Sequence, residues 1–284
     1  MTPIRKPRWL KVKAPTSPEY LRVSKVLSTL KIHTVCQEAN CPNRGDCWFE
    51  GHAAFLILGP ICTRSCRFCD VTTGKPQPVD PEEPTRLAEA VATLKIEHVV
   101  ITSVDRDDLA DGGAGQFAAT LSALNKNEKK VTTEVLTPDF KDKPGALEIV
   151  LAQNPTIFNH NLETVPRLFP TIRPTGSYQI SLDLLKRAKE HNPQVITKSG
   201  IMLGLGEEPN EVLEVMDDLR GAGVVSLTIG QYLAPSSAHH PVARYWEPEE
   251  FAQLKRAGYQ KNFQQVECHP LARSSYRAQA LLKK

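Results

Sequence analysis

The chain has 284 residues, of which 40% are hydrophobic and 24% are charged, and its formal net charge at pH 7 is +3. This length accommodates one α/β barrel-type domain or two smaller domains. The small net charge gives no reason to expect a nucleic-acid partner, and the longest apolar run, at residues 53–59, is far too short to cross a bilayer.

The positive charge is unevenly placed, because Arg5, Lys6, Arg8, Lys11 and Lys13 crowd the start of the chain. A solvated tail is one interpretation, and a contact for an acidic protein partner is the other. No charged-then-apolar leader is recognisable at the N-terminus. We therefore expect a cytoplasmic protein in a reducing compartment, where thiols stay free.

Beyond residue 51, short apolar runs alternate with stretches of helical periodicity. The predicted strands are residues 55–58, 98–102, 132–136, 156–159, 196–202 and 227–232. The predicted helices are residues 85–94, 116–124, 145–152, 181–189, 211–220 and 249–257. This alternation predicts an α/β fold with a parallel sheet and helices outside it. Because a closed barrel needs eight units, we expect a partial, open (β/α)6 TIM-type barrel.

Residues 1–50 and 259–284 fit no βα unit. We interpret them as N- and C-terminal extensions that pack against one end of a barrel formed by residues 51–258, in one integrated domain. No internal repeat or long low-complexity linker suggests another division.

Six of the seven cysteines fall between residues 36 and 69, in two triplets of different spacing. The first has the pattern C-x4-C-x5-C and the second C-x3-C-x2-C; their members are Cys36, Cys41 and Cys47, then Cys62, Cys66 and Cys69. A [4Fe–4S] cluster usually has four cysteine ligands, so each triplet would leave one iron for another ligand. The spacing therefore favours two iron–sulfur clusters.

Other uses of the cysteines are less favoured. The odd number of cysteines and the low cysteine fraction argue against a disulfide framework. Structural zinc is a better alternative, because Cys66 and Cys69 form a C-x2-C pair, and His33 and His52 could complete a mixed site. Inert buried thiols are the third possibility.

The second triplet follows the first predicted strand, and barrel active sites lie at the carboxyl ends of strands. Other polar residues also fall at or after predicted strand ends. They are Asp105, Arg106, Asp107, Asp108, Glu134, Asn159, His160, Asn161, Glu163, Lys198, Glu207, Glu208, Gln231 and Tyr232. Each alone is more simply a scaffold or surface group. Together they predict a polar funnel that faces a cluster.

The C-x3-C-x2-C loop, with Phe68 directly before its last cysteine, resembles the radical S-adenosylmethionine superfamily. The resemblance implies that Cys62, Cys66 and Cys69 hold a [4Fe–4S] cluster whose open iron is chelated by S-adenosylmethionine. One electron from the cluster would cleave this cofactor to methionine and a 5′-deoxyadenosyl radical. The protein would position and shield these groups.

The first triplet, together with the run Arg273-Ser274-Ser275-Tyr276, resembles the lipoyl synthase family within that superfamily. Further runs that match the family are residues 103–109, 111–114, 159–168, 197–200, 231–233 and 240–244. The resemblance implies an auxiliary [4Fe–4S] cluster on Cys36, Cys41 and Cys47, with Ser275, in preference to Ser274, as the fourth ligand. Serine oxygen is a harder donor than thiolate, so it would detach readily from a cluster that is dismantled.

The family's reaction inserts two sulfur atoms, taken from the auxiliary cluster, at C6 and C8 of an octanoyl group on a carrier protein. The implied carriers are octanoylated domains of the dehydrogenase E2 type or the glycine cleavage H type, and a ferredoxin or flavodoxin would supply electrons. The implied cofactor contacts are Phe68, Asn161, Glu163, Arg173 and Lys198, with Asp105 and Arg106 nearer the substrate. Ordinary strand-end ion pairs are the alternative for these residues.

Cys268 has no partner in either triplet, and we interpret it as a bystander, with a role as an alternative ligand near Ser275 left open. Two other functions also stay open. A biotin-synthase-like sulfur inserter would share the radical loop without needing the first triplet, and a zinc-stabilised interaction protein would use the cysteines only as structural ligands.

Overall fold

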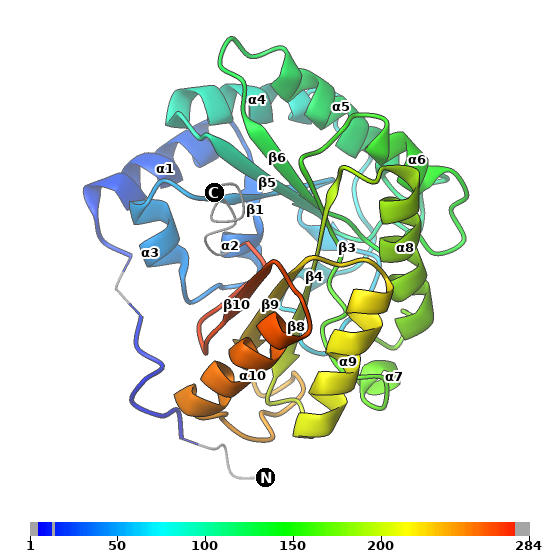
Figure 1. The fold of residues 1–284 in the computed structure, drawn as a ribbon. Helices are drawn as coiled ribbons and strands as arrows, with labels where there is room; N and C mark the ends of the chain where they lie inside the picture. Colours follow the sequence, from blue (N-terminus) through cyan, green and yellow to red (C-terminus); the bar gives the residue numbers. More distant parts are fainter. Residues whose placement is uncertain (1–4, 13–14, 276–284) are drawn as a thin grey trace.

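A computed structural model describes residues 5–12 and 15–275 (Figure 1). Lys13 of the basic N-terminal run, Tyr276 of the Arg-Ser-Ser-Tyr motif and the end of the predicted C-terminal extension lie outside the described residues.

The main sheet has eight strands in the order β1-β2-β5-β6-β7-β8-β9-β10. Their bounds are β1 His33–Thr34, β2 Ala54–Ile57, β5 His98–Ser103, β6 Thr132–Leu136, β7 Ile157–Asn159, β8 Ile196–Leu203, β9 Ser226–Gln231 and β10 Gln265–Cys268. Every neighbouring pair is parallel except β1 and β2. β1 and β10 are the two edges, so the curved sheet does not close within the described residues.

Helices cover the outside of this sheet, as Figure 1 shows. They are α4 Glu83–Leu94, α5 Ala114–Asn125, α6 Ala146–Leu151, α8 Tyr178–His191, α9 Pro209–Gly221 and α10 Pro248–Gln260, with the short α7 Phe169–Ile172 before α8. Each of the six predicted strands is followed by at least one of these helices. The predicted partial (β/α)6 barrel is therefore confirmed.

The C-terminal extension differs from the prediction, because it contributes the parallel strand β10, which follows α10 and pairs with β9. Gln265 and Glu267 alternate with buried Val266 and Cys268, so only one face of this short strand reads as apolar. The N-terminal extension likewise adds β1, which is antiparallel to β2. Both extensions thus continue the sheet at its edges.

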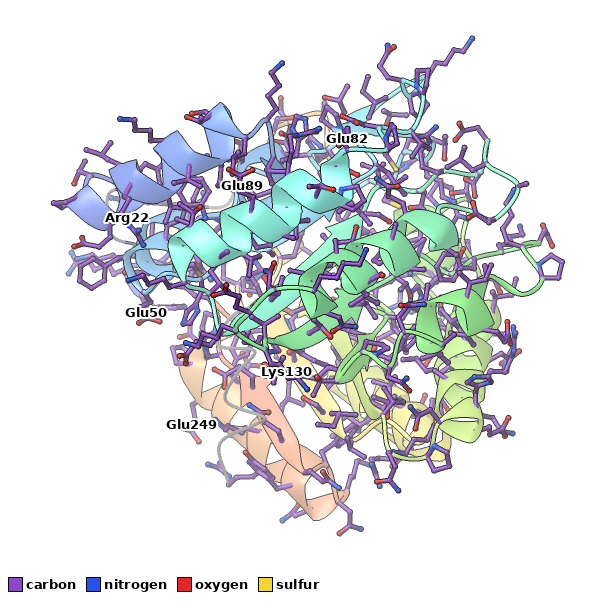
Figure 2. The ribbon with its side chains drawn as sticks, turned by 90° about the horizontal axis from the view of Figure 1, so that it is seen from above. Arg22, Glu50, Glu82, Glu89, Lys130 and Glu249 are labelled. Carbon is purple, nitrogen blue, oxygen red and sulfur yellow. The ribbon has the colours of Figure 1, made fainter. Side chains whose placement is uncertain are left out.

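The N-terminal extension also carries three helices: α1 Pro18–Thr29, α2 Val35–Glu38 and α3 Arg44–Phe49. Tyr20 of α1 stacks on Trp48 of α3 with ring centroids 4.9 Å apart. Figure 2 shows α1, which carries Arg22, alongside α4, which carries Glu89. The Arg22 guanidinium donates to the Thr93 and Leu94 carbonyls, and a cation is favourable at this helix end.

The barrel core is built from apolar strand residues covered on both sides, as parallel strands require. Phe55, Ile101, Val135, Phe158 and Leu227 are all completely buried. No helix in the described ranges combines the length and apolarity that a membrane crossing demands. A separate parallel pair, β3 Ile61–Cys62 and β4 Thr72–Thr73, frames the loop that carries the second cysteine triplet.

Candidate functional site

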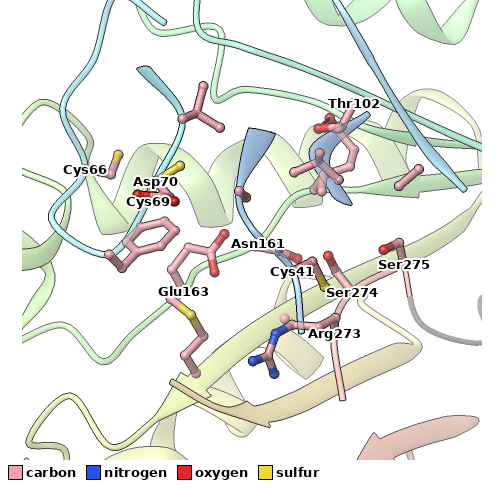
Figure 3. A pocket seen from close by; sticks show the side chains of 18 of the residues that line it. Cys41, Cys66, Cys69, Asp70, Thr102, Asn161, Glu163, Arg273, Ser274 and Ser275 are labelled. Atoms are coloured by element: carbon pink, nitrogen blue, oxygen red, sulfur yellow. Dashed lines mark hydrogen bonds between the residues drawn. The ribbon is translucent and has the colours of Figure 1, made fainter. Parts of the chain in front are cut away.

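A cavity of about 460 Å³ brings together residues from both cysteine triplets and from the C-terminal extension. Its lining includes Cys36, Cys41, Cys62, Cys66, Cys69, Ser274 and Ser275. Figure 3 shows Cys66 and Cys69 on one side and Cys41, Ser274 and Ser275 on the other, with Asn161 and Glu163 between them. Segments far apart in sequence therefore face one another across a single space.

The loop of the second triplet is fixed to the end of β5. The backbone nitrogens of Asp105 and Arg64 donate to the Cys62 Sγ at 3.3 and 3.4 Å, and the Thr63 nitrogen donates to the Asp105 carbonyl at 3.0 Å. Such hydrogen bonds favour the thiolate, which is the form that binds metal. Burial acts the other way and raises the pKa of Cys66 to about 11 and of Cys69 to about 12.

A buried arginine on this loop joins three carboxylates. The Arg64 guanidinium lies 2.7 Å from Asp107, 2.8 Å from Asp139 and 3.3 Å from Asp105. The hydrogen bonds from Arg64 lower the pKa of Asp107, whereas burial raises the pKa of Asp105 despite the nearby cation. The Asp105 Oδ1 is buried without a hydrogen bond among the described residues, and Asp105 lines the cavity. The ion pair with Arg64 thus holds the Asp105 carboxylate beside the cavity.

The wall between the two triplets carries Asn161, Glu163 and Arg173. Glu163 has a φ of 70°, which side-chain-bearing residues rarely adopt, and hydrogen bonds to β8 hold it there. A Cβ on Gly200 would lie 2.9 Å from the Asn161 Oδ1, so glycine leaves room for this amide. Burial raises the pKa of Glu163, although the Arg173 cation opposes the change. The wall offers one carboxyl, one amide and one guanidinium to a polar ligand.

The first triplet lies on two short helices and the turn between them. Cys36 is on α2, Cys47 is on α3, and the Cys41 nitrogen donates to the Cys36 carbonyl at 3.1 Å. Burial raises the pKa of Cys36 to about 11. Cys47 is not among the residues that line the cavity. The Asn40 amide donates to the Asp70 carboxylate, so the loops of the two triplets touch.

The C-terminal extension crosses the mouth of the barrel before it reaches the cavity. The Gln231 nitrogen donates to the Pro270 carbonyl at 3.0 Å, and the Asn43 amide donates to the Leu271 carbonyl at 2.6 Å. A Cβ on Gly230 would lie 2.1 Å from the Ala272 carbonyl oxygen, so only glycine permits this approach. These contacts bring the serine pair to the first triplet.

Arg273 was named in the sequence only as part of a motif, yet it lines the cavity. Burial lowers its pKa, while the charges of Cys41 and Glu163 oppose that change, so its guanidinium lies near the first triplet and the polar wall. No local pattern indicates this, because the position of Arg273 depends on the path of the extension across the mouth.

Two predicted contacts lie outside the cavity lining. Lys198, predicted to bind the cofactor, is 3% exposed inside the barrel and pairs with Glu134, and it does not line the cavity. Arg106, predicted near the substrate, turns back to Asp108 at 2.9 Å and is also absent from the lining. Both side chains form ion pairs within the scaffold, which was the alternative interpretation of these residues.

The rest of the predicted funnel divides in two. Asp105, His160, Asn161, Glu163 and Tyr232 line the cavity, as do Phe68 and Arg173. Asp107, Asp108, Glu134, Asn159, Glu207, Glu208 and Gln231 do not. Cys268 is buried against α10, where its thiol donates a hydrogen bond to the Phe251 carbonyl at 3.1 Å. It does not line the cavity.

The donor set fits iron–sulfur clusters better than zinc. All seven cysteines are free thiols. Among the described residues, no three His, Cys, Asp or Glu side chains converge on a position for one metal ion. A zinc ion needs its ligands around one point, whereas in a [4Fe–4S] cluster each thiolate binds a different iron. His33, a possible zinc ligand, instead lies 2.9 Å from Glu38.

Comparisons with known families agree with this site. A sequence model described as "Radical SAM superfamily" matches residues 56–219, and one described as the N-terminal domain of lipoyl synthase of the radical SAM family matches residues 2–41. The first match covers more than half of the chain and includes the whole second triplet. The second match includes Cys36 and Cys41.

Solved structures share the fold at low sequence identity. SuiB from Streptococcus suis, in a crystal structure with S-adenosylmethionine, is 12% identical with a TM-score of 0.57, over 87% of this chain and 54% of SuiB. Methylornithine synthase is 12% identical with a TM-score of 0.58, over 87% of this chain and 71% of that enzyme. HydG, a maturase of the [FeFe]-hydrogenase, is 14% identical with a TM-score of 0.55, over 87% of this chain and 55% of HydG. The chain thus spans about half the length of SuiB.

Proposed function

The chain belongs to the radical SAM superfamily, and from this premise we propose that it is a lipoyl synthase. In this proposal it inserts two sulfur atoms at C6 and C8 of an octanoyl group that is bound to a lysine of a carrier protein. The sulfur comes from an auxiliary [4Fe–4S] cluster, and a second [4Fe–4S] cluster with S-adenosylmethionine initiates the reaction. The enzyme is therefore a radical sulfurtransferase.

One observation supports this proposal most strongly: five of the six triplet cysteines and the serine pair line the same cavity. The alkyl C–H bonds at C6 and C8 are unactivated, so acid–base side chains cannot supply the chemistry. When bound, the clusters and S-adenosylmethionine would supply an electron, a 5′-deoxyadenosyl radical and sulfur. The residues of the chain hold these groups and shield them from solvent.

The proposed ligands follow from the two sides of the cavity. Cys62, Cys66 and Cys69 hold the radical-generating cluster. On the opposite side, Cys36, Cys41 and Cys47 hold the auxiliary cluster, with Ser275 as its oxygen ligand. The groups proposed to contact S-adenosylmethionine are the ring of Phe68 and the polar wall of Asn161, Glu163 and Arg173. Asp105 is proposed to lie nearer the substrate, and all five residues line the cavity.

The carrier protein must deliver its acyl-lysine through the open side of this cavity. Lys6, from the basic N-terminal run, is one of the lining residues. Arg5, Arg8 and Lys11 are exposed beside it in the chain. We propose that this run attracts an acidic carrier domain of the dehydrogenase E2 or glycine cleavage H type. A small ferredoxin or flavodoxin is the proposed electron donor, and the cytoplasm is the proposed location.

An anaerobic assay tests this function. The reconstituted enzyme is incubated with an octanoyl-lysine peptide, S-adenosylmethionine and a reductant, and 5′-deoxyadenosine and thiolated peptide are quantified by mass spectrometry. We expect both products, with two sulfur atoms in the final peptide. A fully reconstituted enzyme that forms 5′-deoxyadenosine without thiolated peptide would contradict the lipoyl synthase proposal.

Metal analysis separates the alternatives. Two [4Fe–4S] clusters require about eight irons per chain. A biotin-synthase-like enzyme would not use the first triplet for a [4Fe–4S] cluster, so its iron and sulfide content would differ. A zinc-stabilised interaction protein would be colourless and contain zinc. The purified protein should be brown, and iron and acid-labile sulfide should be present in equal amounts.

A further inference from the structure

Inside the barrel, below the cavity, two charged side chains form a buried pair. The Lys198 Nζ on β8 lies 3.0 and 3.1 Å from the two carboxylate oxygens of Glu134 on β6. The Asn159 amide donates to the same carboxylate at 2.8 Å, and the His98 Nε2 lies 3.6 Å from it. Burial raises the pKa of Glu134, but Lys198, His98 and Asn159 together outweigh burial, and the pKa is lowered. The lowered pKa favours the ionised form of the Glu134 carboxylate beside Lys198.

The Lys198 ammonium makes a third hydrogen bond, to a group outside the barrel core. It donates to the Ser274 carbonyl oxygen at 2.5 Å. An ammonium group has three N–H donors, so Glu134 and Ser274 use all of them. The Ser274 carbonyl belongs to the peptide group that joins Ser274 to Ser275. The bond therefore fixes the peptide plane between the two candidate ligands.

This bond is also the last anchor of the extension in the part of the chain that the structure describes. Gln231 and Asn43 donate hydrogen bonds to the Pro270 and Leu271 carbonyls. Because Gly230 has no side chain, the Ala272 backbone can lie against it. Beyond Ala272, no other hydrogen bond within the described ranges reaches Ser274 or Ser275. Without Lys198, the serine pair would keep its connection to the anchored segment but lose its own contact with the barrel.

We propose that Lys198 is a positioning residue, which holds the Ser274–Ser275 peptide from inside the barrel and thereby presents a serine hydroxyl to the auxiliary cluster. The role of that hydroxyl rests on the proposed function, whereas the position of the peptide does not. Stability alone gives no reason for a buried lysine, since apolar side chains of similar volume often serve a core equally well. The hydrogen bond from Lys198 to the Ser274 carbonyl gives the buried ion pair a positioning role.

The test removes the ammonium without leaving an unpaired buried charge. Lys198→Met alone would leave the buried Glu134 carboxylate without its cation and destabilise the fold, so it is compared with the double variant Glu134→Gln/Lys198→Met. In the metal-free proteins, we expect backbone amide exchange in peptides covering residues 269–275 to be at least about tenfold faster in the double variant than in the wild type. Exchange in α4 should not change.

A matched control is Lys189→Met. Lys189 also uses its ammonium to hold backbone carbonyls, those of Pro193 and Val195, at 2.8 and 2.9 Å. This variant should loosen residues 192–196 and leave exchange in residues 269–275 as in the wild type.

The reconstituted proteins supply a second readout. In the double variant we expect Mössbauer spectra to lose the signal of the oxygen-ligated iron, 5′-deoxyadenosine formation to stay within about twofold, and thiolated product to fall at least tenfold. Unchanged exchange in residues 269–275 would overturn the positioning role. Faster exchange with an intact oxygen-ligated iron would also overturn it, because the contact would then be structural only. A wild-type enzyme that makes no thiolated product would refute the proposed function, while the exchange data would still decide what Lys198 does.

Discussion

Cysteines of both triplets line one cavity, but the two triplets are held in different ways. The Cys62–Cys69 loop is attached to the barrel itself, through Arg64 and its carboxylate partners and through the backbone of Asp105. The Cys36–Cys47 region belongs to an extension, and its anchor to the C-terminal segment joins residues 228 positions apart in sequence. In the proposed function, the site built into the scaffold would hold the cluster that persists through each turnover. The site assembled from two extensions would hold the cluster that is dismantled and rebuilt.

The sharpest way to separate the two triplets is to remove one cysteine from each. Cys66→Ala should abolish 5′-deoxyadenosine and thiolated product, a loss on the order of a thousandfold or more in each rate. Cys41→Ala should keep 5′-deoxyadenosine formation and lose only the thiolated product. Both products are measured in one anaerobic assay. Cys268→Ser, which retains a hydrogen bond to the Phe251 carbonyl, should change neither, and loss of 5′-deoxyadenosine in Cys41→Ala would contradict the division of roles.

The attachment of the radical loop to the barrel predicts a large stability effect. Arg64→Leu leaves the fully buried Asp139 carboxylate without its closest cation, which should lower the free energy of unfolding by about 3–5 kcal/mol. Urea denaturation of the metal-free protein measures this change. Arg187→Leu breaks an exposed pair with Glu148 and should cost no more than about 1 kcal/mol. Equal effects of the two substitutions would show that the Arg64 network does not anchor the loop.

The buried thiols predict how the metal-free protein responds to alkaline pH. The pKa of Cys36 rises from 9.0 to about 11 on folding, so the folded state holds the proton more tightly than the unfolded state. This contribution to stability is complete below pH 9 and disappears as the pH rises to about 11. For Cys36 the loss is about 2–3 kcal/mol.

Urea denaturation at pH 8 and at pH 10.5 measures this alkaline loss. Cys36→Ala should show a smaller decrease between the two pH values than the wild type. The same decrease in both proteins would exclude Cys36 as the source.

The anchor between the two extensions predicts a smaller effect on the auxiliary site alone. Asn43→Ala removes the hydrogen bond to the Leu271 carbonyl and should cost about 1–2 kcal/mol. We expect a chelator to remove iron from the auxiliary site several times faster than in the wild type, with the radical cluster unaffected. Asn127→Ala removes a hydrogen bond that the Asn127 side-chain amide donates to the Ala88 carbonyl, away from both triplets, and is the control. Faster iron loss from both sites of Asn43→Ala would argue against separate anchoring.

The smallest expected effect concerns the approach of the carrier. Lys6→Glu should raise the KM for a whole octanoylated carrier domain by about threefold to tenfold at low salt, and leave the KM for a short octanoyl-lysine peptide unchanged. Lys126→Glu, at the exposed end of α5, should change neither value. An equal rise for domain and peptide would place Lys6 at the acyl chain and not at the docking surface.

Most of the barrel could be predicted, because apolar strands and amphipathic helices alternate with clear periods. β10 could not, since Gln265 and Glu267 hide its single apolar face. Lys198 was assigned to the mouth, but it lies near the start of β8, opposite Ser226 at the start of β9. The sequence predicts which strand contains a residue more readily than it predicts how deep in the barrel interior that residue lies. Arg273 was missed as a cavity residue because only tertiary contacts place it there.

The late position of the segment that crosses the barrel mouth has a consequence for synthesis of the protein. A nascent chain that has emerged only as far as β9 already contains all six triplet cysteines but lacks Leu271, the partner of Asn43, and the serine pair. The barrel triplet can form its contacts at that stage, whereas the auxiliary site is still open on one side. A chain truncated before this segment therefore lacks both the Leu271 contact and the serine pair. Under the proposed function, such a chain would bind the radical-generating cluster but would lack the oxygen ligand of the auxiliary cluster.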